Sequence, residues 1–191
     1  MDKNITKFPN DGKDLDWVLG VYASEIERRT KYVNQAKEEL DRIVENTNSD
    51  IDSLRKVMEI VNHSAAISRM KQKAGRPPTK EMRDIMKDRV KAINDKWADL
   101  PKEPAGLIAI RNSLEHFENR LDDWSANSKT NVHIGSINVI GVELDEAIKV
   151  KNAEKKYWRV FDGENFSLFN DSINIIEVCE WVNEMNLAVK N

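Results

Sequence analysis

Apolar residues recur at helical spacing through most of residues 14–125. A long helix is predicted for residues 14–45, because one stripe contains Leu15, Val18, Tyr22, Ile26, Val33, Ala36, Leu40 and Ile43. A second helix is predicted for residues 51–71. Thr79 can cap a third, whose stripe is Met82, Met86, Val90, Ile93 and Trp97. A fourth helical run extends from Ala105 to Trp124. This pattern is typical of an antiparallel helical bundle.

The predicted second helix carries two apolar faces. Its main face is formed by Leu54, Met58, Val61 and Ala65, and its second face by Ile60, Ile67 and Met70. Two apolar faces indicate either deep burial or a subunit interface. His63 lies on the second face, and we interpret it as a structural histidine. Arg29 interrupts the stripe of the first helix, either with its stem on the core and its head in water or with its guanidinium turned toward a shared cleft.

The pattern changes character after Trp124. Residues 131–142 are rich in Val, Ile and Gly, which predicts one or two short strands. Residues 157–161 and 166–169 flank Asp162-Gly163, which predicts a hairpin. A final amphipathic helix near residues 175–185 presents three apolar residues on one side, namely Ile175, Cys179 and Val182.

These elements predict a mainly α protein in two parts. Residues 14–125 form an antiparallel helical bundle, and residues 131–191 form a small α+β cap of hairpin and helix that docks on it. A chain of 191 residues is long enough for one such domain with an appendage. No apolar run approaches the ~20 residues of a membrane-spanning helix. The start of the chain lacks a secretory signal, and the single Cys179 suits a buried apolar role, so we expect a cytoplasmic protein.

The segment with the most chemical content is Arg111-Asn112-Ser113-Leu114-Glu115-His116. At ~100° per residue, one arc of this helical run forms a core face through Leu107, Ile110, Leu114, Phe117, Leu121 and Trp124. The opposite side carries Asn112, His116, Asn119 and Asp123, together with the apolar Ile108. Arg111 and His116 project about 140° apart and flank the polar face. One helix cannot easily direct both at one ligand atom, whereas two copies across a twofold axis could.

The R-N-x-x-x-H spacing of Arg111, Asn112 and His116 resembles the signature of the HEPN family of helical nucleotide-binding and ribonuclease domains. The resemblance implies a helical bundle that dimerises through its motif helices and forms a composite site for metal-independent RNA cleavage. His116 would take the proton of a ribose 2′-OH and return one to the leaving oxygen. Arg111 would hold the phosphate, and Asn112 would orient His116 or bind RNA. Many members bind partners or nucleotides without cutting RNA.

A local excess of positive charge lies around this segment. Residues 69–131 carry 14 basic and 10 acidic groups, although the whole chain has a net charge of −3. Lys71, Lys73 and Arg76 belong to the most basic stretch. They form either a solvated loop or a surface that contacts RNA phosphates without sequence selectivity.

Other catalytic patterns are missing from the sequence. It contains no Walker loop, G-x-G-x-x-G, H-E-x-x-H or C-x-x-C pattern, and three scattered histidines with one cysteine favour neither a metal site nor a cofactor. Our leading hypothesis is a homodimeric HEPN-type endoribonuclease, acting as a toxin or abortive-infection effector in a bacterial or phage conflict system. Its dimer would use the motif helix and the second face of the second helix. The alternative is a non-catalytic helical scaffold, an antitoxin-type partner or a regulatory binding module.

Overall fold

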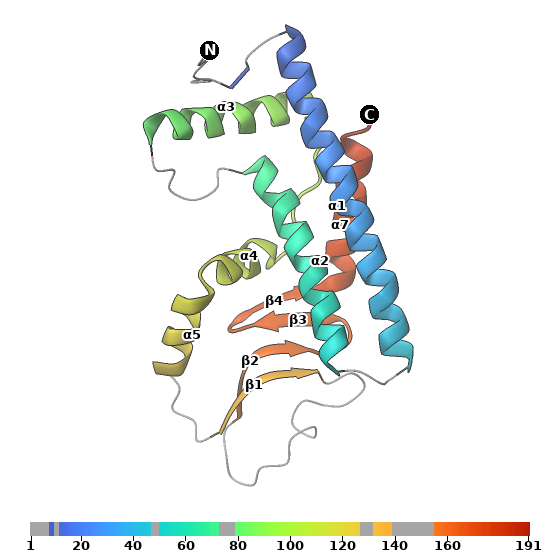
Figure 1. Ribbon diagram of the computed structural model, residues 1–191, viewed down its shortest axis with the longest axis vertical. Coiled ribbons are helices and arrows are strands. Elements are labelled where there is room, and N and C mark those ends of the chain that lie inside the picture. The colour runs from blue at the N-terminus through green and yellow to red at the C-terminus, as the bar shows by residue number, and fades with distance from the viewer. Residues whose placement is uncertain (1–7, 10–11, 47–49, 73–78, 127–131, 139–154) are drawn as a thin grey trace, which may run out of the picture.

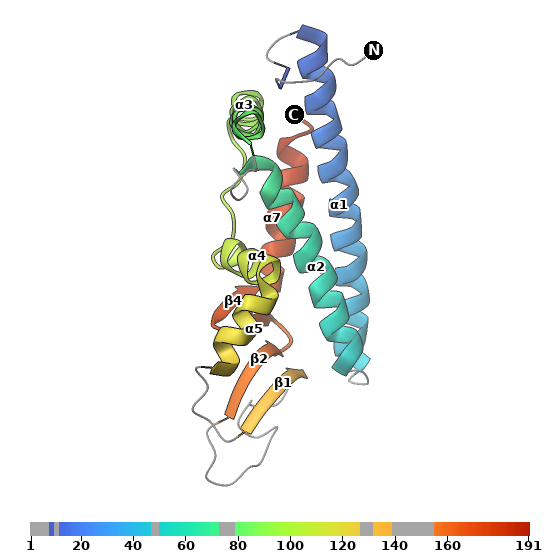
Figure 2. The same ribbon diagram turned by 60° about the vertical axis from the view of Figure 1, so that its left-hand side comes forward.

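The computed structural model describes residues 8–9, 12–46, 50–72, 79–126, 132–138 and 155–191. The described part is mainly helical, with a small C-terminal sheet and a final helix, as the sequence predicts. Helices α1 (Gly12–Asn46) and α2 (Asp50–Lys71) pack as a long hairpin, and α7 (Ile175–Ala188) packs against both. Figure 2 shows α1 along one edge of the molecule, with α2 and α7 on its inner side.

Each of the three long helices buries a stripe of apolar residues at helical spacing. In α1 the stripe includes Ile26, Val33, Ala36 and Leu40, as predicted. In α7 the buried side chains include Ile175, Cys179 and Val182 on the expected side. Burial raises the pKa of the Cys179 thiol to about 12, because the thiolate would lose its hydration. Cys179 therefore has the packing role that the sequence predicts.

Helix α2 lies at the centre of the fold. It contacts α1 and α7, and it also contacts α3, α4 and β1. Ile60 and Ile67 on its predicted second face are fully buried within the protomer, as is Val61 on its main face. Both apolar faces therefore pack inside the protomer. The second face is not available as a subunit interface, and the expectation that it joins two copies is wrong for this reason.

Helix α3 (Lys80–Lys96) begins at the predicted cap, where Thr79 Oγ1 accepts a hydrogen bond from Met82 N at 3.2 Å. Its stripe is only partly buried: Ile93 and Trp97 join the core, whereas Met82 is exposed. Arg89 ties α3 to the end of α2, because its Nη2 donates to the Gln72 carbonyl at 2.9 Å. A cation at the C-terminus of α2 satisfies a carbonyl that the helix leaves without a partner.

The C-terminal part forms a four-stranded sheet in the order β1-β2-β3-β4. Strand β1 (Val132–Asn138) is parallel to β2 (Lys155–Phe161), and β2, β3 (Asn165–Leu168) and β4 (Asp171–Asn174) form an antiparallel meander. The predicted hairpin is β2–β3, in which Phe161 pairs with Phe166. The sequence did not reveal β4, whose Ile173 pairs with Phe166 and is buried with it.

The sheet and α7 join the helical body in one hydrophobic core. Buried residues from the helices and from β2, β3 and β4 belong to a single cluster. Asn174 ends the sheet and caps α7, since its Oδ1 accepts from Ile176 N at 2.9 Å and Glu177 N at 3.1 Å. Helix α7 packs against both α1 and α2. No helix in the described ranges is both long and apolar enough to span a bilayer.

A glycine at the start of the motif helix allows this helix to pack closely against the sheet. Gly106 has φ 86° at the N-cap of α4 (Leu107–Glu115), in the left-handed region that favours glycine. A Cβ at this position would lie 2.0 Å from the Ser172 carbonyl oxygen of β4. Close packing of α4 on β4 therefore requires a residue without a side chain.

We predict that Gly106→Ala lowers the free energy of unfolding by about 2 kcal/mol or more, because the new methyl group adds a clash to an unfavourable φ. Urea titration followed by circular dichroism measures the change. The matched control is Ala105→Gly at the neighbouring exposed position, which should have a much smaller effect. Equal effects of the two substitutions would show that the backbone approach is not required.

Candidate functional site

The segment with the R-N-x-x-x-H spacing forms two helices. Helix α4 ends at Glu115, α5 (Phe117–Ala126) follows, and His116 between them has φ −119° and ψ 37°. The prediction of one continuous helix from Ala105 to Trp124 is wrong at this residue. The kink directs α5 along the sheet, where the Phe117 ring lies 5.3 Å from that of Trp158 and 5.7 Å from that of Phe169. These aromatic contacts come from the C-terminal part, so the helical period of the segment could not reveal them.

Arg111 points into the protein. Its side chain is 8% exposed, and its Nη1 donates to Ser68 Oγ at 3.1 Å and to Gln72 Oε1 at 3.0 Å. Its Nη2 donates to Asn112 Oδ1 at 3.3 Å. The helix period placed Arg111 at the margin of an outer polar face. It lies against α2 instead, and its guanidinium holds α4 to the C-terminal end of α2.

The Arg111 guanidinium belongs to a polar cluster between α2 and α4. Glu115 Oε1 accepts from Arg69 Nε at 2.8 Å and lies 3.9 Å from Arg111 Nε, so the carboxylate faces both cations. Gln72, which accepts from Arg111, also donates to Glu103. Gln72 and Glu115 are therefore each held in place by a second contact.

Sequence reasoning missed the partners of Arg111 on α2. A signal for them exists, because Ser64, Ser68 and Gln72 follow one another at a spacing of four residues, close to the apolar Ile60, Val61 and Ile67. Ser64 and Ser68 are fully buried. A polar row inside a buried helix predicts a polar partner from another element. The sequence alone does not identify that partner as Arg111.

His116 and Asn112 lie differently from Arg111. The His116 side chain is exposed at the kink, and Asn112 is half-buried beside Arg111. Ile108 is 41% exposed on the same outer side, as the helical period predicts. Within one protomer, Arg111 faces α2 and His116 faces solvent, so the two side chains do not converge on one ligand.

Of the three residues expected to bind RNA, Lys71 is described. Its Nζ donates to the Pro101 carbonyl at 2.6 Å and lies 5.8 Å from the centre of the Trp181 ring. Burial lowers the pKa of Lys71, since the charged amine loses hydration, and the carboxylate of Glu103 opposes this effect. Lys71 thus serves to join α2 to the Pro101 segment and to α7. Lys73 and Arg76 lie outside the described residues.

Arg29 and His63 come together between α1 and α2. Arg29 Nη1 lies 3.4 Å from His63 Nδ1, and Arg29 Nε lies 2.7 Å from Glu25 Oε1. The His63 ring also packs against Tyr32, with 5.0 Å between the ring centres. Burial, followed by the charge of Arg29, lowers the pKa of His63. A neutral imidazole between two helices agrees with a structural role for His63.

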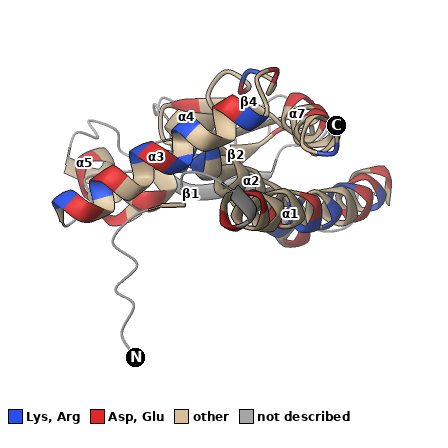
Figure 3. Cartoon of the chain, turned by 90° about the horizontal axis from the view of Figure 1, so that it is seen from above, with Lys and Arg blue, Asp and Glu red and all other residues tan. Residues whose placement is uncertain are grey.

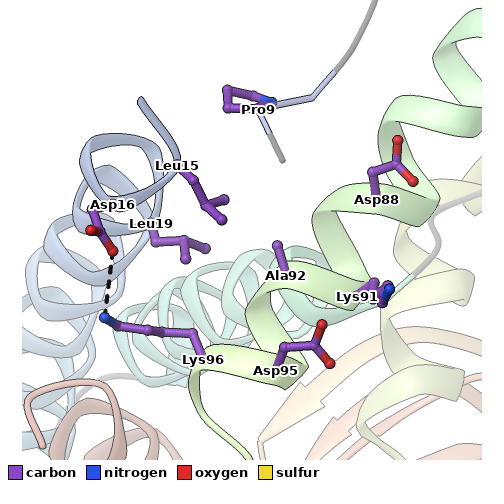
Figure 4. A pocket seen from close by; sticks show the side chains of 9 residues that line it. All are labelled: Pro9, Leu15, Asp16, Leu19, Asp88, Lys91, Ala92, Asp95 and Lys96. Carbon is purple, nitrogen blue, oxygen red and sulfur yellow. Dashed lines mark ion pairs between the residues drawn. The ribbon is translucent and has the colours of Figure 1, made fainter. Parts of the chain in front are cut away.

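A cleft of about 390 Å³ separates the start of α1 from α3 (Figure 4). Leu15 and Leu19 of α1 face Ala92 of α3, and Lys96 Nζ lies 3.6 Å from Asp16 Oδ1 across the opening. The cleft has an apolar floor and carboxylates and amines at its edge. Its described lining contains no Ser, Thr, Cys or His side chain, and it lies away from the residues around Arg111.

The described residues contain no group of three His, Cys, Asp or Glu side chains arranged to hold a metal ion. Comparison of the chain with protein-family models, curated proteins and solved structures finds no match. The HEPN resemblance therefore depends on the Arg111, Asn112 and His116 spacing and on the helical fold.

We predict that Arg111→Ala lowers the free energy of unfolding by about 2 kcal/mol or more, because Ser68 and Gln72 lose a charged donor in a buried place. Chemical denaturation measures the change. Arg120→Ala, at an exposed position of α5, is the matched control and should stay within about 0.5 kcal/mol of wild type. If the two variants were equally stable, Arg111 would have no structural role.

We also predict a pH dependence of stability from His63. Its pKa is below the unfolded value of ~6.5, so its contribution is fully present above that pH and is lost as the pH falls through the folded pKa. The free energy of unfolding of wild type should fall between about pH 7 and pH 5, and His63→Gln should reduce the slope. Denaturant titrations at several pH values provide the test. An unchanged slope in the variant would exclude His63 as its source.

Proposed function

We propose that the chain is a non-catalytic helical module that binds another polypeptide, the scaffold alternative drawn from the sequence. The observation that carries this proposal is the inward orientation of Arg111. A ribonuclease of the expected type would use this guanidinium to hold a phosphate, but its Nη1 and Nη2 donate to Ser68, Gln72 and Asn112 inside the protomer. These internal hydrogen bonds explain the presence of Arg111 at this position without a bound phosphate.

The exposed apolar side chains support a binding role. Trp17 is 71% exposed and Val21 is 49% exposed, and both lie on the outer side of α1. Large apolar residues gathered on one face mark interaction surfaces more often than isolated ones do. We keep the expectation of a cytoplasmic location. In this proposal, the exposed helix faces bind the protein partner.

A cleavage assay tests the proposal. Purified wild type and His116→Ala should both leave single-stranded and structured RNA intact, and expression of either should leave host growth unchanged. Analysis of product ends adds chemical detail, because attack by a ribose 2′-OH leaves a 2′,3′-cyclic phosphate. Cleavage with such ends by wild type alone would overturn the non-catalytic proposal.

The second candidate is the HEPN-type endoribonuclease, and one observation favours it. His116 is exposed at the kink, one turn after Asn112, where its imidazole is accessible to RNA. A general base works near neutral pH when imidazole can exchange protons with the substrate. In this candidate Arg111 positions Asn112 instead of holding phosphate, and a second copy supplies the other half of the site.

The two candidates differ in a second measurement. If the endoribonuclease is correct, cleavage persists in excess chelator, because an imidazole needs no metal, and His116→Ala lowers the rate by about 10² or more. Lys73 and Arg76 would then add affinity for phosphate, and their joint neutralisation should reduce the salt dependence of RNA binding. Growth arrest by wild type that His116→Ala relieves would support a toxin or abortive-infection role.

A further inference from the structure

The break between α4 and α5 at His116 has no cause in the local sequence. Sharp kinks in helices usually occur at proline, at glycine or where another group inserts into the hydrogen-bond ladder. Residues 107–126 contain neither proline nor glycine. One apolar stripe continues across the break at helical spacing, through Leu107, Ile110, Leu114, Phe117 and Leu121. The local sequence therefore favours one continuous helix.

Three hydrogen bonds of the helical ladder are missing at the break. His116 N donates to the Asn112 carbonyl at 3.1 Å, and Arg120 N donates to the His116 carbonyl at 3.0 Å. Between these two bonds, the amides of residues 117–119 do not donate to the carbonyls of residues 113–115, and no other described residue replaces these partners. Because each such bond stabilises a helix, contacts elsewhere must offset the loss.

Aromatic contacts from the sheet provide this offset. The Phe117 ring lies against the rings of Trp158 and Phe169, which stack on each other with 6.1 Å between their centres. Phe169 adopts φ 56°, which is unfavourable for a bulky residue, and its N donates to the Trp158 carbonyl at 2.7 Å. Asp123 and Trp124 make further interactions along α5. The bent form thus depends on contacts that are distant in sequence.

The two sides of the break differ in how firmly they are held. Helix α4 has four buried residues, and Arg111 and Glu115 tie it to the end of α2. Helix α5 has no buried residue. Figures 1 and 3 show α5 near the margin of the molecule, on the side away from α1. The break therefore separates an anchored helix from one that is only partly packed.

We propose that α5 is a hinged arm, which exchanges between the bent position on the sheet and a straight continuation of α4. The bent form keeps the ring contacts of Phe117, and the straight form regains three helical hydrogen bonds. Ring contacts and single hydrogen bonds make contributions of similar size, so the two forms are close in free energy. Straightening uncovers the rings of Trp158 and Phe169. The inference goes beyond the proposed function, because the arm moves whether or not the chain cuts RNA.

Double electron–electron resonance on the full chain measures the position of α5. One spin label is attached at Ser125→Cys on α5 and the other at Glu180→Cys on α7, both at exposed positions, whereas the native Cys179 is buried. This pair should give two distance populations. The control pair combines Ile108→Cys on the anchored α4 with the same label on α7, and it should give one population.

Substitutions should shift the two populations in opposite directions. Phe169→Ala removes a ring from the sheet side without changing the helix sequence, so it should raise the ratio of straight to bent form at least about twofold. His116→Ala favours the continuous helix, whereas His116→Gly disfavours it, and the ratio should differ about fivefold between these variants. Trp17→Ala removes an exposed ring far from the hinge and should change nothing.

Two results would overturn the hinge. One is a single distance for the α5 pair that none of the substitutions changes, because the break would then be fixed. The other is a second population that the α4 control pair shows as well, because the movement would then belong to the whole helical segment. Neither result depends on RNA cleavage, which decides the non-catalytic function separately.

Discussion

Burial of α2 on more than one side is the constraint on which the remaining structure depends. A helix with two apolar faces cannot be stable on the surface, because one face would stay in water. Helix α1 covers one side, and α7 and α4 cover others. Each of these neighbours brings its own apolar stripe, and the stripes meet in one core. The sheet supports this arrangement, because β4 contacts both α7 and α4, two of the helices that cover α2.

Helical spacing predicted most of this body correctly, and particular residues show why. Ile26, Val33 and Leu40 recur on one side of a helix, and local sequence is sufficient to place them in a core. The β2–β3 hairpin was predictable for a similar reason, because Asp162-Gly163 separates two apolar runs. Strand β4 was missed because its four residues form no long alternating pattern. The parallel pairing of β1 with β2 is non-local, and no short segment encodes it.

The candidate site shows a different limit of sequence reasoning. Helical periodicity gives the direction of a side chain around its own helix, but it says nothing about which neighbour that side reaches. Arg111 was expected at the edge of a solvent face, yet its guanidinium donates to Ser68 of α2 and to Gln72, the residue that follows this helix. The kink at His116 was missed for the same reason, because Trp158 and Phe169, which contact Phe117 beside it, are distant in sequence. Polar residues whose partners are distant in sequence are therefore the ones most easily misassigned.

The packing of α7 against α1 has a consequence for biosynthesis. Asn34 of α1 hydrogen-bonds to Asn183 of α7 at 3.0 Å, although 149 positions separate them in the chain. While the ribosome is still translating the segment between them, the α1–α2 hairpin has left the exit tunnel without the helix that covers its remaining apolar side. That surface is open to chaperones and to neighbouring nascent chains during this interval. Completion of the core is thus a late event, which occurs only after α7 has been synthesised and released from the tunnel.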